Sequence, residues 1–407
     1  MGEIDGGTFL TNLEARPSSL DSKETSSLKD CKNLLIASLD VDPDPEISKT
    51  EDILFGVATE LGRLEAAFSS FAHFIGQSNA SLLAVVPPSN DAEVRGQKLR
   101  KRGLDVTLIA SDLPFTQRYF HLVPELQAHI KSSRPSTKWV VLIDDDTFFS
   151  SVHQIGYRLS TLDHRKPQYI GGLSEAEWQL NHFGWMGFGG AGVFLSGALL
   201  DILDANYDVC AGEEIGGLDM PGDGRLAQCI YMVAPDVFVT PWNELRQWDI
   251  RGNADGIFES GREIWSYHHW ADSGWLKTDV VKMSAVSLVA GEKSILRRWI
   301  FDRIGSKKEE KREYFVLNNG YSIAHYSLEP GVEEINFDET EFTWSQEAPG
   351  YEDALGPFRP IPQKMVGVMK KTWWLRDAIR LGYNIHQIYQ RVDDDQEDVI
   401  ELVWLGQ

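Results

Sequence analysis

Three adjacent carboxylates, Asp144, Asp145 and Asp146, directly follow the strongest apolar run of the chain, residues 139–143. Neighbouring carboxylates repel one another unless a cation compensates them, and hard oxygen ligands suit Mg²⁺ or Mn²⁺. One acid of such a group can bind the metal while another contacts a ribose or a metal-bound water. The alternative is a solvated acidic turn, as we expect for residues 393–395. The apolar residues on both sides of 144–146 favour the metal site.

Two further segments contain residues that suit such a site. Gly189, Gly190, Ala191 and Gly192 precede an apolar run. Small residues let the backbone approach a ligand and direct N–H groups at it, although they also serve close packing between helix and strand. The pair His268–His269 offers imidazole nitrogens, which bind first-row metals, or it has a purely structural role.

Asp223 lies in a glycine-rich segment between Cys210 and Cys229. A carboxylate on such a loop could act as general base on a hydroxyl group. Equally, Asp223 could form a turn or cap a helix that begins near Arg225. The two cysteines either close this loop as a disulfide, which would contribute about 3 kcal/mol, or remain buried thiols.

The segments that must position these residues alternate between short apolar runs, typical of buried strands, and apolar residues at helical spacing. Because strands that alternate with helices form mostly parallel, doubly wound sheets, ligands are expected beyond the carboxyl ends of the strands. Residues 144–275, rich in Gly, Trp, His and Asp, are typical of a loop-built binding surface. We expect strands at 33–37, 54–59, 81–86, 104–109 and 139–143, and helices at 61–74, 91–102 and 117–130.

The last third of the chain has a different pattern. Residues 280–288 and 313–326 favour β-structure, 372–389 are expected to form a helix, and 399–405 a strand. The sequence predicts three parts: a disordered tail over 1–30, an α/β domain over 31–279 and a β-rich extension over 280–407.

The composition excludes several classes of protein. The 407 residues include 39 basic and 61 acidic side chains, which gives a formal net charge of −22. Such a charge argues against nucleic acid and anionic membrane surfaces, because both are bound by clustered Lys and Arg. Three cysteines exclude a disulfide-rich miniprotein. No run approaches 18 consecutive apolar residues, and the first residues lack the pattern of a signal peptide.

Five segments, in this order and spacing, resemble the fringe-like glycosyltransferases of family 31, in particular the plant and fungal branch of mostly unassigned substrate. They are WVVLIDDDTFF (139–149), YIGGLSE (169–175), GFGGAGVFLS (187–196), GDGRLAQC (222–229) and YHHW (267–270). The resemblance covers roughly residues 50–275.

The resemblance implies a GT-A fold and an inverting, Mn²⁺-dependent transfer of a sugar from a UDP-sugar to a hydroxyl of a glycan or glycoprotein, in a β-1,3 linkage. It assigns the metal to Asp146 and His268, with His269 as the alternative if the register shifts by one. Asp144 and Asp145 correspond to the nucleotide side. The segment of Gly189, Gly190, Ala191 and Gly192 corresponds to the loop beside donor and acceptor.

Two departures from the family leave alternatives open. Relatives show two consecutive acids where this chain has Asp223–Gly224. Asp223 is therefore the expected base, Asp219 is a further candidate, and a catalytically inactive sugar- or nucleotide-binding relative is the alternative function. The family also implies the lumen of the Golgi or endoplasmic reticulum and a membrane anchor. This sequence shows no such anchor, so a soluble or secreted form is expected as the other option.

Overall fold

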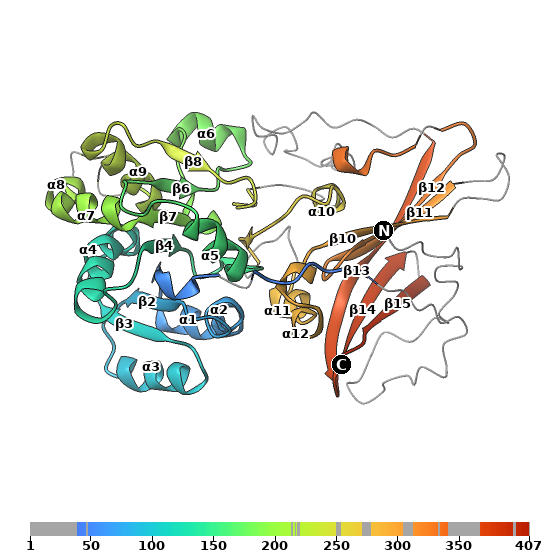
Figure 1. The fold of residues 1–407 in the computed structure, drawn as a ribbon, viewed down its shortest axis with the longest axis horizontal. Helices are drawn as coiled ribbons and strands as arrows, with labels where there is room; N and C mark the ends of the chain where they lie inside the picture. The colour runs from blue at the N-terminus through green and yellow to red at the C-terminus, as the bar shows by residue number, and fades with distance from the viewer. Residues whose placement is uncertain are drawn as a thin grey trace.

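The computed structural model describes residues 39–45, 48–212, 215, 217, 220–249, 254–270, 278–303, 312–332, 334–340, 367–393 and 396–406. The expected tail, the strand at 33–37 and the candidate base Asp219 lie outside these residues. The described chain contains an α/β part and a separate antiparallel sheet, which lie side by side (Figure 1).

The α/β part is built on a seven-stranded sheet with the order β3-β2-β1-β4-β7-β6-β8. All neighbours are parallel except β7, which is antiparallel to both β4 and β6. The expected α/β class with a mostly parallel sheet is therefore confirmed. The strands are β1 (Ile53–Ala58), β2 (Ser81–Val86), β3 (Val106–Ala110), β4 (Trp139–Ile143), β6 (Tyr169–Gly171), β7 (Val193–Ser196) and β8 (Val239–Pro241).

Helices cover both faces of this sheet, which explains why its central strands are apolar throughout. In β1, Phe55 and Val57 contribute to one buried cluster and Leu54 to the cluster on the opposite face. The helix expected at 61–74 is two helices that meet at Ala67. The helices are α1 (Leu61–Ala66), α2 (Phe68–Phe74), α3 (Ala92–Lys101), α4 (Phe115–Ser133), α5 (Val152–Ser160), α6 (Glu177–Phe183), α7 (Gly197–Ala205), α8 (Tyr207–Ala211) and α9 (Gly222–Val233).

A second, six-stranded sheet follows as an antiparallel meander, in the order β10-β11-β12-β13-β14-β15. This confirms the expected β-rich character of the C-terminal part. Its strands are β10 (Arg298–Arg303), β11 (Arg312–Asn318), β12 (Ser322–Leu328), β13 (Val368–Leu381), β14 (Asn384–Asp393) and β15 (Gln396–Trp404).

Two expectations for this region were wrong. Residues 280–288, expected to be β-structure, form α11 (Val280–Ser284) and the start of α12 (Ser287–Ala290). The Asp279 side chain caps α11 by accepting the backbone N–H groups of Val281 and Lys282, and such a cap outweighs the β-propensity of valine. Residues 372–389, expected to be a helix, form the β13–β14 hairpin, whose turn places Gly382 at a φ of 63°.

Several short elements lie outside the two sheets. A two-stranded ladder pairs β5 (Phe148–Phe149) with β9 (Ser266–Tyr267). Helix α10 (Asp255–Glu259) lies between the sheets in Figure 1. Single 3-10 turns are found at η2 (Thr50–Asp52), η3 (Gly189–Ala191), η4 (Glu292–Ser294) and η5 (Phe337–Glu339).

Polar contacts connect α10 to the C-terminal sheet. The Lys370 ammonium on β13 lies 3.1 Å from Oδ2 of Asp255 and 2.7 Å from Oε1 of Glu259. Tyr321 and Trp374 also donate to Asp255, at 3.1 and 3.0 Å. Because α10 lies between Asp249 and His268 in the chain, the C-terminal sheet supports the segment that carries both.

Cys210 on α8 and Cys229 on α9 form a disulfide, with 5.4 Å between their Cα atoms. Of the two alternatives for these cysteines, the bridge is therefore the one observed. The bridge lies within the buried cluster on the α4–α9 side of the sheet. Among the described helices, none combines the length and the hydropathy needed to cross a membrane.

Candidate metal centre

The strand order brings the predicted site residues to one edge of the seven-stranded sheet. The acidic triplet begins where β4 ends, at Ile143. Strand β7 runs antiparallel to β4, with Leu142 opposite Val193, so the glycine-rich turn that precedes β7 lies at this same edge. Parallel strand β1 also ends here, at Ala58. This edge is where ligands bind in doubly wound sheets.

The β5–β9 ladder brings the histidines to the acids. Phe148 pairs with Tyr267 in antiparallel register, so the residues just before β5 face those just after β9. His268 and His269 consequently lie beside Asp146. His269 has a left-handed backbone, with a φ of 58°, and its ring centroid lies 3.7 Å from that of His268. The left-handed residue turns the second imidazole back toward the same carboxylate.

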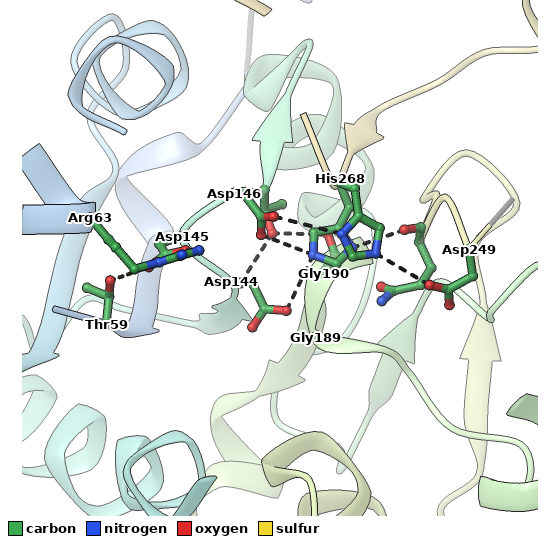
Figure 2. Close-up of polar contacts among 12 residues, drawn as sticks. Thr59, Arg63, Asp144, Asp145, Asp146, Gly189, Gly190, Asp249 and His268 are labelled. Carbon is green, nitrogen blue, oxygen red and sulfur yellow. Dashed lines mark hydrogen bonds and ion pairs between the residues drawn. The ribbon is translucent and has the colours of Figure 1, made fainter. Parts of the chain in front are cut away.

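Asp146, His268 and His269 each offer one ligand atom, and these atoms lie within 4.8 Å of one another. Nε2 of His268 is 3.1 Å from Oδ1 of Asp146, and Nδ1 of His269 is 3.9 Å from its Oδ2 (Figure 2). Oδ2 of Asp144 lies 3.6 Å from Nε2 of His268. One carboxylate and two imidazoles form a mixed oxygen–nitrogen set that suits a first-row divalent metal.

The hydrogen bond on the other ring nitrogen favours the metal-binding tautomer of His268. Its Nδ1 lies 3.0 Å from the carbonyl oxygen of Gln247, which can only accept, so Nδ1 carries the proton. In the neutral ring, Nε2 then has no proton, and its lone pair lies on the side of Asp146. Such an outer hydrogen bond is typical of metal-binding histidines.

The charges of this group stabilise one another. Burial lowers the pKa of His268, but Asp146, Asp144 and the Gln247 carbonyl raise it to about 9. Burial raises the pKa of Asp146, but the hydrogen bond and charge of His268, together with the charges of His269 and Arg63, leave it below its usual value. Burial and the surrounding acids raise the pKa of Asp144 to about 7, although His268 opposes them. A bound cation would relieve this concentration of carboxylates.

Asp145 points away from the histidines. Its Oδ1 accepts from a terminal nitrogen of Arg63 at 2.6 Å, its Oδ2 accepts from Nε of Arg63 at 2.7 Å, and the Thr59 hydroxyl also donates to Oδ2 (Figure 2). Such a bidentate pair fixes the carboxylate. Asp145 therefore connects the triplet to the end of β1 and to α1, and its predicted contact with the nucleotide stays a prediction.

The glycine-rich turn packs against the histidine. A Cβ atom on Gly190 would lie 2.2 Å from ring atoms of His268, so only glycine fits there. The N–H groups of Gly189, Ala191 and Gly192 donate to Asp223, to the Phe188 carbonyl and to the Gly189 carbonyl. These contacts favour the close-packing role, and the predicted ligand contact of this turn stays a prediction.

Asp223 lies in the first turn of α9 and is not its cap, since Pro221 occupies that position. Its Oδ2 accepts from the N–H of Gly189 at 3.0 Å, and its Oδ1 from the N–H of Gly224 at 2.8 Å. Burial raises the pKa of Asp223, with a further increase from Asp249, against the effect of these hydrogen bonds. The carboxylate lies beside the glycine-rich turn and is a stronger base than an exposed one.

Sequence reasoning missed Asp249. Its Oδ1 is 3.4 Å from Nε2 of His269, and its Oδ2 accepts from the Ser174 hydroxyl at 2.7 Å (Figure 2). The Asp249 N–H donates to Oε2 of Glu175 at 3.2 Å. Ser174 and Glu175 belong to a segment that the sequence marked, but Asp249 stands in no motif, and only the fold brings it to the histidines.

No family model and no curated protein matches the chain. Similar solved structures include mouse xyloside xylosyltransferase 1, which is 11% identical, with a TM-score of 0.30, over 46% of this chain and 84% of its own. The galactosyltransferase LgtC, solved with donor and acceptor sugar analogues, is 9% identical with a TM-score of 0.31, over 46% of this chain and 73% of its own. A glycosyltransferase involved in the glycosylation of the major capsid of PBCV-1 is 13% identical with a TM-score of 0.31, over 54% of this chain and 94% of its own. At these scores the likenesses carry no argument about the function, and the resemblance to family 31 is not confirmed.

Proposed function

We propose that the chain is a metal-dependent, inverting glycosyltransferase that moves a sugar from a UDP-sugar to a hydroxyl of a glycan or glycoprotein. The observation that carries the proposal is the group of Asp146, His268 and His269 at the carboxyl edge of the parallel sheet. The five sequence segments that resemble family 31 supply the donor class, the fold type GT-A and the β-1,3 linkage.

The donor set at the sheet edge fits a divalent metal such as Mn²⁺. Asp146 and His268 would hold it, with His269 as a further ligand, and the Gln247 carbonyl keeps Nε2 of His268 available. When bound, the metal supplies a Lewis acid for the charge that develops on the departing diphosphate. Asp144, which shares this edge, lies on the side proposed for the nucleotide.

Asp223 is proposed as the base. One of its remaining lone pairs takes the proton of the acceptor hydroxyl as that oxygen attacks the anomeric carbon from the face opposite UDP. The raised pKa of Asp223 suits this role, because a base works best when its pKa approaches the working pH. Asp249 is the rival base, since it faces His269 in the same site.

A donor assay tests the proposal. The protein is incubated with Mn²⁺ and a panel of UDP-sugars, and UDP release is measured with and without hydroxyl acceptors. Acceptor-stimulated, EDTA-sensitive release of UDP is expected with at least one donor. Binding of UDP without turnover on any donor would instead support the second candidate, a non-catalytic binding relative. That candidate is considered because Gly224 stands where relatives have a second acid.

Localisation follows the same resemblance. We propose the lumen of the Golgi or endoplasmic reticulum, because the proposed acceptors are glycans or glycoproteins. The Cys210–Cys229 disulfide is consistent with an oxidising compartment. The three-part division at residues 30 and 279 remains part of the proposal.

A further inference from the structure

Near its start, α4 carries two consecutive buried side chains, each with one buried polar atom that has no hydrogen-bond partner among the described residues. Arg118 and Tyr119 are each 4% exposed. Among the described residues, no partner is found for Nε of Arg118 or for the hydroxyl of Tyr119. Buried polar atoms are usually paired, so two consecutive exceptions are a reason to ask whether a ligand pairs with them, and their position decides the answer.

The Tyr119 hydroxyl lies against the candidate site. A Cβ atom on Gly189 would lie 2.7 Å from this hydroxyl, and one on Gly222 would lie 2.4 Å from Cβ of Tyr119. The tyrosine thus packs between the glycine-rich turn and the residue that precedes Asp223. Burial raises the pKa of Tyr119 well above its usual value, with further increases from Asp144 and Asp223. The phenol therefore remains protonated, and its hydrogen is available to a ligand.

Among the described residues, the guanidinium of Arg118 has no ion-pair partner. Within the described part of the chain no carboxylate lies within 4.0 Å of its guanidinium, which faces Phe115, its carbon 6.0 Å from the ring centroid. Burial lowers the pKa of Arg118, and only Glu60 opposes this. Because burying an unpaired cation is unfavourable, an anionic ligand would be stabilised here. Glu60 follows β1, so this charge lies toward the same carboxyl edge of the sheet.

We propose that this part of α4 is a ligand-binding element, in which Arg118 takes an anionic group and the Tyr119 hydroxyl donates to a sugar hydroxyl that also contacts Asp144 and Asp223. A ligand that carries both groups is a nucleoside diphosphate sugar. The inference rests on the proposed function and names two contacts for its donor that no sequence motif contains.

Titrations with UDP and with the UDP-sugar that the wild type binds best, both in Mn²⁺, test the proposal. Tyr119→Phe should weaken the UDP-sugar about three- to tenfold, the range of one neutral hydrogen bond, and leave UDP unchanged. Arg118→Met should weaken both ligands equally, by about tenfold or more as for a bond to a charged group, and Arg118→Lys should recover part of the loss.

Thermal unfolding separates this role from a structural one. Tyr314 is the matched control, since it is 3% exposed and its hydroxyl also has no partner among the described residues. Because an unpaired buried hydroxyl does not stabilise the fold, Tyr119→Phe and Tyr314→Phe should both unfold at or above the wild-type temperature. Only Tyr119→Phe should change ligand affinity.

The outcomes distinguish this proposal from the proposed function. A Tyr119→Phe variant with unchanged affinity for the UDP-sugar overturns the role of Tyr119, and an Arg118→Met variant with unchanged affinity for UDP overturns that of Arg118. A wild type that binds UDP-sugar without transferring it refutes the enzyme and leaves this binding element standing. A wild type that binds neither ligand overturns both.

Discussion

Nε2 of His268 faces Oδ1 of Asp146 at 3.1 Å, across the turn that ends β4. In the free protein each group stabilises the charged form of the other, which is why the pKa of His268 rises while that of Asp146 falls. A metal ion would replace the proton between them. This pair is therefore the first target for mutation.

Asp146→Asn and His268→Gln should each weaken Mn²⁺-dependent binding of UDP. Loss of a metal ligand should cost more than the 10- to 100-fold typical when a residue that only hydrogen-bonds a ligand is changed, so we expect a weakening of about 100-fold or more. Calorimetric titration of UDP with and without Mn²⁺ measures it. His182→Gln, on an exposed position of α6, is the control. Retained Mn²⁺-dependent binding in both variants would refute the metal assignment.

Asp223→Ala should lower turnover by about 10²–10⁴, the range of general-base catalysis, with UDP affinity little changed. The variant also releases the N–H of Gly189, so Asp223→Asn, whose amide oxygen can still accept that N–H, is measured beside it. Steady-state kinetics should show both variants equally slow. Full activity in Asp223→Asn would mean that the side chain only holds the turn, and Asp249→Asn would then be examined as the base.

Gly190→Ala should disrupt the centre. The added Cβ would lie 2.2 Å from the His268 ring, and we expect a destabilisation of about 1–3 kcal/mol with loss of metal affinity. Gly224→Ala is the matched control, because its Cβ would meet nothing closer than Met220 at 3.6 Å. As glycine weakens a helix, this control should be neutral or stabilising by up to about 1 kcal/mol. Urea unfolding compares the two, and equal stabilities would contradict the proposed packing.

Lys370→Met should destabilise the fold by about 3–5 kcal/mol, since it leaves Asp255 and Glu259 buried without their cation. Burial already raises the pKa of Glu259, and Lys370 opposes that rise. The adjacent exposed Lys371→Met should change the unfolding free energy by less than about 0.5 kcal/mol. Denaturant midpoints of the two variants test this, and indistinguishable midpoints would show that the network adds nothing.

His153 should make part of the stability depend on pH. Nδ1 of His153 donates to Oε2 of Glu292 at 3.0 Å, and this hydrogen bond raises the pKa of His153 although partial burial lowers it. Because this pKa is raised on folding, the stabilisation is complete below about pH 6.5, the value of an unperturbed histidine, and is lost as the pH rises through the folded value. His153→Gln should remove this part, up to about 1 kcal/mol. The difference in unfolding free energy between wild type and His153→Gln should be larger at pH 6 than at pH 9. The same difference at both pH values would contradict the assignment.

The sequence predicted the parallel strands well, because β1, β2 and β4 are apolar on both faces and are followed directly by Thr59, Pro87 and Asp144. The resemblance assigned Asp146 and His268 to one site, and these side chains lie 3.1 Å apart, while their role as metal ligands stays a prediction. The local sequence around either residue does not predict this contact, because it depends on the register of the β5–β9 pair. Asp249 and Tyr119 were missed for the same reason: each reaches the site from an element whose own sequence shows only a helix or a loop.

Local propensity failed in the C-terminal part. Residues 372–389 contain bulky apolar side chains spaced as in a helix, yet they form a hairpin. Leu375 pairs with Tyr389 within the hairpin, and Trp373 pairs with Ile323 on the neighbouring β12. Strand preference depends on such neighbours more than on the residue itself. For residues 280–288 the error was the opposite one, a strand predicted where a helix forms, because the Asp279 side chain caps α11.

The polar contacts between α10 and β13 limit how this molecule could be shortened or recombined. A fragment that ended before β13 would retain Asp255 and Glu259 yet lack Lys370 and Trp374, which serve them now. These two acids, which precede the imidazoles in the chain, would then lose a cation and a hydrogen-bond donor. A chimera whose last strands come from another protein would therefore need equivalents of both Lys370 and Trp374.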